Sequence, residues 1–216
     1  VRSPICMASS WSFWCVSTQP ILPADASGPG NSPLSSLVMA RAPVYLSDSV
    51  SIHSCASFWR ITFSPGGPGH VLYLKSELTD GQLRIYSDNI AMTRWLQSTV
   101  QGMLNAETAD LAIPVIDAVF SKYGDMRDYW TEQLQAGPDT IALTWYNIGE
   151  PLLVHTHPNE PPERRYGVCT ILMPALGARL TVNGRQASGQ AWPREREGRP
   201  FSTCALAFSE SWTEGR

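Results

Sequence analysis

A succession of short alternating segments, separated by turn residues, constrains the fold of this chain more than any other feature. After Pro114 the chain consists largely of segments rich in the β-branched and aromatic residues that favour strands. They are PVIDAVFSKY, DYWTEQLQ, TIALTWYNI, PLLVHTH, YGVCTILMP, ARLTV, GRQASGQAW and STCALAFSESW. Between two of them, Asn183-Gly184 predicts a tight type I′ hairpin turn. This many sequential strands at short spacing predict an antiparallel β-barrel or a strongly bent sheet.

One earlier segment, over about residues 88–105, has the period of a helix. Its apolar residues recur at spacings of three and four and so form one face. They are Met92, Trp95, Leu96, Val100, Met103 and Leu104. We therefore expect one amphipathic helix packed on a mainly β domain over residues 44–216. Residues 1–43 include a stretch rich in Pro, Gly and Ser, which predicts a poorly ordered N-terminal extension.

Charge and composition argue against several classes of partner. The net charge is −3, and the Lys and Arg residues are not clustered as they would be to neutralise phosphates. We therefore expect no nucleic-acid binding. No apolar run reaches the roughly 18 residues that a membrane-spanning helix needs. The five cysteines are odd in number and lack metal-finger spacing, which favours free thiols in a reducing, cytoplasmic setting. The N-terminal segment loosely imitates an export signal, so an exported protein is the alternative.

Three acidic residues fall on apolar strand faces. They are Glu132, Glu210 and Asp117. Alternation places Glu132 on the face of Trp130, and Glu210 on the face that holds Phe208 and Trp212. A carboxylate among aromatic rings is costly unless it is paired or protonated. Inside a barrel, Glu132 and Glu210 would form an acid/base pair with raised pKa values. In the alternative reading these acids lie at strand ends, in water or beside arginines.

Residues 149–167, GEPLLVHTHPNEPPERRYG, carry two histidines one residue apart. Alternation points the imidazoles of His155 and His157 to one side, the geometry by which a sheet offers two nitrogens to one metal ion. Glu160 and Glu163 follow and could complete a site of two histidines and one carboxylate with open positions. The prolines after His157 favour the alternative, in which the strand ends there and both glutamates lie in an exposed loop.

The same stretch resembles the first motif of the cupin family. That motif is a Gly, five residues, His-x-His, a short gap to Glu, and six residues to a second Gly. The matching positions are Gly149, His155, His157, Glu160 and Gly167. The gap before Glu160 is shorter than usual in the family, and no histidine follows position 157 to supply its second motif. The resemblance implies an enzyme with a divalent metal such as Fe, Mn, Ni or Zn.

The strand pattern is also similar to that of lipocalin-type ligand carriers and the barrel enzymes like them. Eight Trp, seven Tyr and six Phe can line an interior large enough for a small organic molecule. We therefore expect a barrel that binds a small apolar ligand without a cofactor. If it is an enzyme, we expect non-redox acid/base chemistry such as isomerisation, hydration or elimination. The alternatives are a cupin-like metalloenzyme and a non-catalytic structural or interaction module, and a homodimer is compatible with each.

Overall fold

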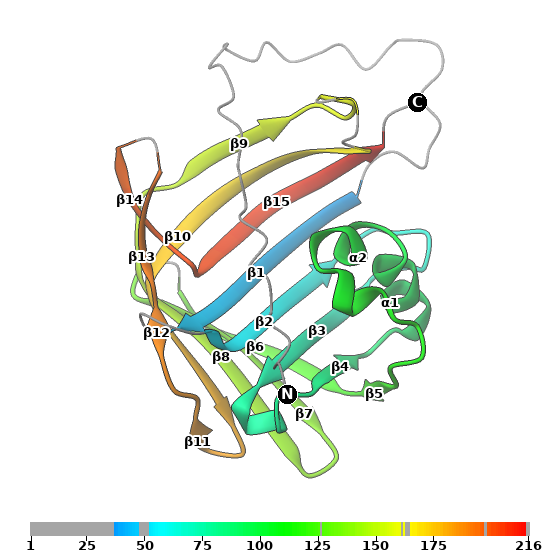
Figure 1. Ribbon diagram of the computed structural model, residues 1–216, viewed down its shortest axis with the longest axis vertical. Helices are drawn as coiled ribbons and strands as arrows, with labels where there is room; N and C mark the ends of the chain where they lie inside the picture. Colours follow the sequence, from blue (N-terminus) through cyan, green and yellow to red (C-terminus); the bar gives the residue numbers. More distant parts are fainter. Residues whose placement is uncertain are drawn as a thin grey trace, which may run out of the picture. The chain divides into compact units, whose positions relative to one another are not determined.

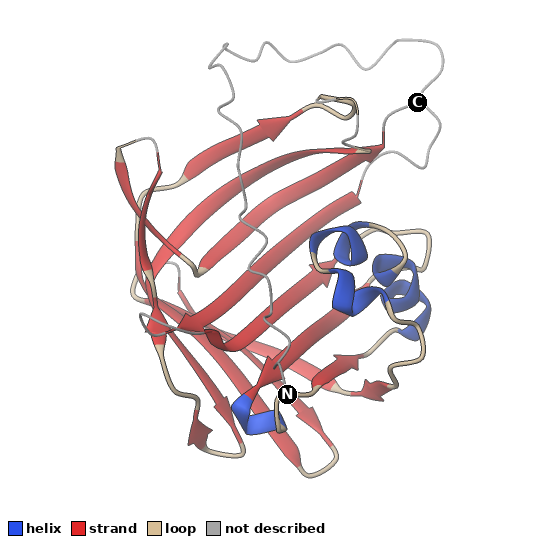
Figure 2. Cartoon of the chain, in the orientation of Figure 1, coloured by secondary structure: helices blue, strands red, loops and turns tan. Residues whose placement is uncertain are grey.

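The computed structural model of the protein describes residues 37–47, 52–125, 127–160, 162, 165–196 and 198–214, with residues 37–47, 52 and 53 described by their backbone alone. Up to residue 36, the expected N-terminal extension lies outside the described residues. The first strand begins at Leu37, before the domain start that the sequence suggested at residue 44. Strands make up most of the described chain (Figures 1 and 2), which confirms a mainly β fold.

The strands form one large sheet and a separate two-stranded ribbon. They are β1 (Leu37–Ser47), β2 (Ile52–Ile61), β3 (Gly69–Ser76), β4 (Leu83–Ser87), β5 (Val115–Asp117), β6 (Val119–Asp125), β7 (Tyr129–Ala136), β8 (Asp139–Ile148), β9 (Leu152–Thr156), β10 (Tyr166–Val182), β11 (Arg185–Gln186), β12 (Gln190–Ala191), β13 (Pro193–Arg196), β14 (Arg199–Ser202) and β15 (Ala205–Glu214). The order in the large sheet is β5-β4-β3-β2-β1-β15-β10-β8-β7-β6. β9 and β11 also pair with β10, and β12 pairs with β1. Among the described strands, every pair is antiparallel except β4 with β5, which is parallel.

The two ends of this strand order are joined by a single residue. β5 and β6, the first and last strands of the order, flank Ala118 in the chain. One residue spans only about 3.8 Å between neighbouring Cα atoms, so the sheet has to curl until its ends approach each other. Ala118 is buried, and its N–H donates to the Ser87 carbonyl at 3.1 Å. The strongly curled antiparallel sheet confirms the expected bend and divides the segment PVIDAVFSKY into two strands.

Strand β10 carries the sheet from one layer into the other. Up to Pro174 it pairs with β9 and β15, and from Ala175 onward it pairs with β8. YGVCTILMP and ARLTV, expected as two strands, are therefore one long strand. In Figure 1, β6, β7 and β8 cross the direction of β1, β2 and β3 at a steep angle. The curl thus encloses an interior between the two layers.

Apolar side chains cover both faces of the sheet. The inner face, which the curl encloses, carries a core that includes Phe58, Leu72, Leu134, Leu143 and Trp145. The outer face packs against α1 (Ile90–Gln97), with α2 (Val100–Leu104) following it. The core of the outer face includes Trp59, Val71, Tyr73, Met92 and Leu96. Because β2 and β3 are covered on both faces, their polar residues do not simply face water.

The helical segment forms two helices instead of the single expected one. α1 ends at Gln97, and the hydroxyls of Ser98 and Thr99 donate to the Trp95 carbonyl at 2.9 and 2.7 Å. Such back-bonding competes with continuation of the helix. Val100 and Leu104 of α2 still pack in the outer core, but the break leaves Met103 exposed. Within the described residues, no helix has the length and apolar character needed to cross a membrane.

Candidate functional site

Glu132 lies on the inner face, as the alternation predicts. On β7 it stands across from Lys122 of β6 and from Leu143 of β8. Its side chain is only 5% exposed. The indole N–H of Trp130, two residues earlier on the same face, donates to Glu132 Oε1 at 3.0 Å. The carboxyl group is therefore held in an apolar interior by a hydrogen bond from its own strand.

The other oxygen of this carboxyl group is bound from the opposite layer. Arg60 Nη2, on β2, lies 2.7 Å from Glu132 Oε2, so the ion pair crosses the interior. Burial raises the pKa of Glu132 above its ordinary value, and the charge of Arg60 and the hydrogen bond from Trp130 offset this only in part. Glu132 consequently keeps its proton to a higher pH than an exposed glutamate does.

Arg60 also connects Glu132 to a histidine. Arg60 Nη1 donates to His70 Nε2 at 2.7 Å. A guanidinium group has no acceptor, so the lone pair of the imidazole is at Nε2 and its proton is at Nδ1. Nδ1 donates to Asp88 Oδ2 at 2.5 Å, while the His70 backbone N–H donates to Asp88 Oδ1 at 2.6 Å. The side chains of His70 and Asp88 are 23% and 35% exposed, so this polar path (Asp88, His70, Arg60 and Glu132) leads from water to a buried acid.

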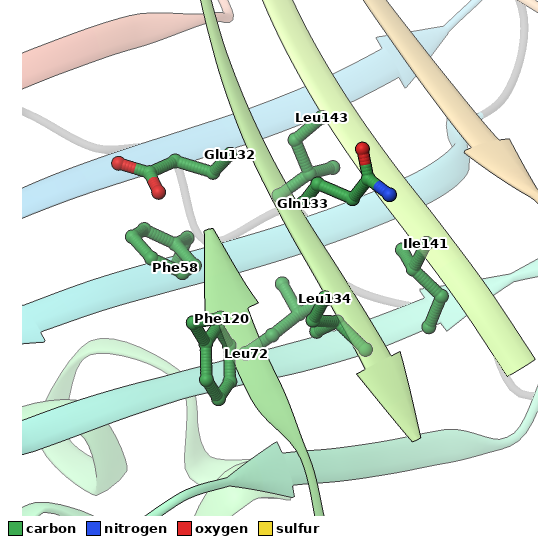
Figure 3. Close-up of a pocket in the computed structure, with 8 residues that line it drawn as sticks. All are labelled: Phe58, Leu72, Phe120, Glu132, Gln133, Leu134, Ile141 and Leu143. Atoms are coloured by element: carbon green, nitrogen blue, oxygen red, sulfur yellow. The ribbon is translucent and has the colours of Figure 1, made fainter. Parts of the chain in front are cut away.

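Aromatic rings flank the polar path. The His70 ring stacks on Phe120 with 5.2 Å between centroids and lies 6.4 Å from the ring of Phe58. In Figure 3 the Phe58 ring lies beside the Glu132 carboxyl group, and the Phe120 ring lies beyond it, next to Leu72. The hollow that these groups line is too narrow to hold a water molecule. The roomy interior expected from the aromatic content is therefore absent beside Glu132, and a ligand would meet the polar path at its exposed end.

Glu210 lies on the opposite face of the sheet from Glu132. Ser209 has a φ of 49°, and the register of β15 with both neighbouring strands shifts around this residue. Such a β-bulge reverses the alternation. Phe208 therefore packs in the inner core and Trp212 in the outer core, where the Trp212 indole N–H donates to Glu210 Oε1 at 2.7 Å. The prediction that Glu132 and Glu210 form one acid/base pair is wrong.

Asp117 is exposed at the end of β5. Its expected apolar face depended on one continuous strand, but the break at Ala118 places Val119 in a different strand, where it is 73% exposed. The expectation of a buried acid at position 117 is therefore wrong. Asp117 faces water at the end of its strand.

His155 and His157 do lie together, with 4.5 Å between their ring centroids. Their strand ends at Thr156, and Glu160 is exposed beyond it, as the exposed-loop reading expects. Glu163 lies outside the described residues. Among the residues that are described, no three His, Cys, Asp or Glu side chains are grouped closely enough to hold a metal ion.

Sequence reasoning missed Arg60, His70 and Asp88. Arg60 alternates with Trp59 and Ile61 in SFWRITF, a pattern typical of a half-buried strand, whereas both faces of β2 are covered in the structure. A usable signal was present, because folding SFWRITF onto HVLYLKSEL across the SPGGPG turn makes Arg60 and His70 direct cross-strand partners. The acid that faces His70 comes from the end of β4, which pairs with β3.

Comparison of the chain with protein-family models, with curated proteins and with solved structures finds no match. The functional assignment therefore rests on the geometry of these side chains.

Proposed function

We propose that this chain binds a small organic molecule at the exposed end of the polar path and exchanges protons with it. The path itself carries the proposal, because it links a buried carboxyl group of raised pKa to solvent through Arg60 and His70. A perturbed pKa with a specific charged partner marks functional sites more often than ordinary surface. The stacked rings of Phe120 and His70 offer an apolar surface against which the body of the ligand can pack.

The chemistry that suits this arrangement is a non-redox proton transfer, as in isomerisation, hydration or elimination. Asp88 orients the His70 ring and stabilises a proton at Nδ1. The His70 Nε2 lone pair becomes a base once Arg60 turns fully toward Glu132, with which it already pairs. Glu132 holds Arg60 in that position, so His70 alone takes the proton at Nε2 and returns it to another atom of the ligand. None of these proton transfers requires a cofactor. In this proposal the chain is a lipocalin-like ligand carrier in which the polar path catalyses proton transfer on the bound molecule.

A thermal-shift screen of small organic molecules tests the proposal. His70→Asn retains an N–H toward Asp88 but removes the imidazole base, and His155→Asn is the matched control on another strand. We expect compounds that raise the Tm of the wild type and of His155→Asn but not that of His70→Asn. Compounds that stabilise His70→Asn and Glu132→Gln as strongly as the wild type would show that binding occurs elsewhere and would refute the proposal.

A metal-dependent enzyme is the second candidate function, favoured by the 4.5 Å separation of the His155 and His157 rings. Elemental analysis of the purified chain and of His155→Ala tests it. Stoichiometric Fe, Mn, Ni or Zn that is lost in the variant supports this candidate, and protein without bound metal refutes it.

A further inference from the structure

A second cavity lies on the outer side of the sheet, at the break between α1 and α2. Its volume is about 340 Å³, which is within the range of pockets that hold small molecules, roughly 300–1,000 Å³. The lining residues that matter here are Ser98, Thr99, Met103, Ala109, Arg165 and Tyr166. Tyr166 belongs to the outer core, so this cavity and Glu132 are on opposite faces of the sheet.

One wall of the cavity is apolar and partly flat. The Tyr166 side chain is 8% exposed and its ring is fixed in the outer core. Met103 also lines the cavity and is 48% exposed, because the helix break moves it out of the buried stripe. Ala109, at the end of the short 3-10 turn η2 (Ala106–Ala109), adds a small apolar surface. A ring between methionine and tyrosine side chains gains dispersion and sulfur–aromatic contacts.

The cationic group of the cavity is Arg165. Its guanidinium lies 5.1 Å from the centroid of the Tyr166 ring, which limits its orientation. Arg165 Nε and Nη2 both contact one oxygen of Glu214, each at 2.6 Å. Within the part of the chain that the structure describes, Nη1 has no partner and leaves one edge of the guanidinium fork available for a ligand. Guanidinium forks prefer carboxylates, to which they can donate two parallel hydrogen bonds.

Two further polar groups of the cavity, the hydroxyls of Ser98 and Thr99, can act as acceptors. Ser98 Oγ and Thr99 Oγ1 donate their protons to carbonyl groups of the last turn of α1. Each oxygen therefore keeps lone pairs that can accept a hydrogen bond. A ligand that combines these features has an anionic group for Arg165, a flat apolar body and one hydrogen-bond donor.

We propose that this cavity is a binding site for a small aromatic carboxylic acid that carries a hydroxyl group. The carboxylate binds the free edge of Arg165, the ring lies between Met103 and Tyr166, and the hydroxyl donates to Ser98 or Thr99. Glu214 contacts the other edge of the same guanidinium and its charge repels a second carboxylate, so the site binds the ligand more tightly when Glu214 is neutralised.

Isothermal titration with 4-hydroxybenzoate and with its uncharged methyl ester tests this site. The Arg165 side chain is 62% exposed, so solvent screens its charge, and we expect the acid to bind the wild type only about threefold more tightly than the ester. Arg165→Met should abolish this preference, and Glu214→Gln should lower the Kd of the acid. Met103→Trp should weaken both compounds by filling the cavity. These positions are exposed or half-exposed, and thermal melts confirm that the variants fold.

His70→Asn separates this site from the polar path, since the variant should bind 4-hydroxybenzoate as the wild type does. Equal affinity of the wild type for the acid and its ester would overturn the proposal. The absence of saturable binding at millimolar concentrations, or an Arg165→Met variant that still prefers the acid, would overturn it as well.

Discussion

The ion pair between Arg60 and Glu132 should contribute substantially to holding the two layers of the sheet together. A double-mutant cycle with Arg60→Met and Glu132→Gln removes the charges while keeping side chains of similar length. Two unit charges about 4 Å apart attract by roughly 4 kcal/mol at an effective dielectric constant of about 20. The carboxylate is 5% exposed, but the arginine is 25% exposed and solvent screens it in part. We therefore expect a coupling free energy of about 3 kcal/mol.

Urea unfolding of the wild type, the two single variants and the double variant, followed by tryptophan fluorescence, gives this coupling. The pair of Lys75 and Glu107 is a matched control, because its N–O distance of 2.6 Å is similar while its side chains are 37% and 43% exposed. The control cycle should yield no more than about 1 kcal/mol. A similar value of about 1 kcal/mol or less for Arg60 and Glu132 would refute the reasoning, because it would mean that water screens the pair as it does at a surface.

The remaining predictions concern pH dependence and two close-packed positions. The folded chain holds the proton of Glu132 more tightly than the unfolded chain does, because burial raises the pKa of this carboxyl group. The free energy of unfolding of the wild type, relative to that of Glu132→Gln, should therefore fall as pH rises from the ordinary pKa of 4.5 through the raised folded value. Urea titrations at a series of pH values measure this difference, and a rise with pH would contradict the prediction. Gly102→Ala should destabilise the chain by about 1–3 kcal/mol in urea unfolding, although Ala favours helices more than Gly does. The reason is that the added Cβ would lie 2.1 Å from the Gln97 carbonyl oxygen. Unchanged stability would contradict this close approach. Gln101→Leu should lower the free energy of unfolding by about 1–3 kcal/mol, because Gln101 Oε1 accepts a 2.7 Å hydrogen bond from the buried indole N–H of Trp59. The same urea unfolding assay measures this loss. An unchanged free energy of unfolding would show that another acceptor replaces the amide.

Where the local pattern runs uninterrupted, the sequence predicted the structure well. Asn183 and Gly184 take φ values of 53° and 76° and form the hairpin between β10 and β11. Alternation along β7 is regular, so Glu132 faces the inner core as expected. Turn chemistry and side-chain period are local properties, and a few neighbouring residues determine them.

Single-residue irregularities account for most of what was mispredicted. The bulge at Ser209 reverses every side chain after it and so moves Glu210 to the outer face. Ala118 divides one expected strand between the two ends of the sheet and leaves Asp117 in water. No simple residue pattern marks either position. The site around Arg60 depends on a contact between segments that are far apart in the sequence, because Arg60 on β2 is covered by Glu132 on β7.

The pairing of β1 with β15 has a consequence for the order in which the chain can fold. Leu37 pairs with Trp212, so the middle of the strand order joins segments from opposite ends of the described chain. Such non-local contacts close a long loop before they contribute any free energy, and topologies that depend on them fold slowly. During synthesis the backbone edge of β1 that β15 later occupies stays vacant until nearly the whole domain has emerged. Until then that edge is a template on which a strand from another molecule can add, and aggregation during refolding should begin there.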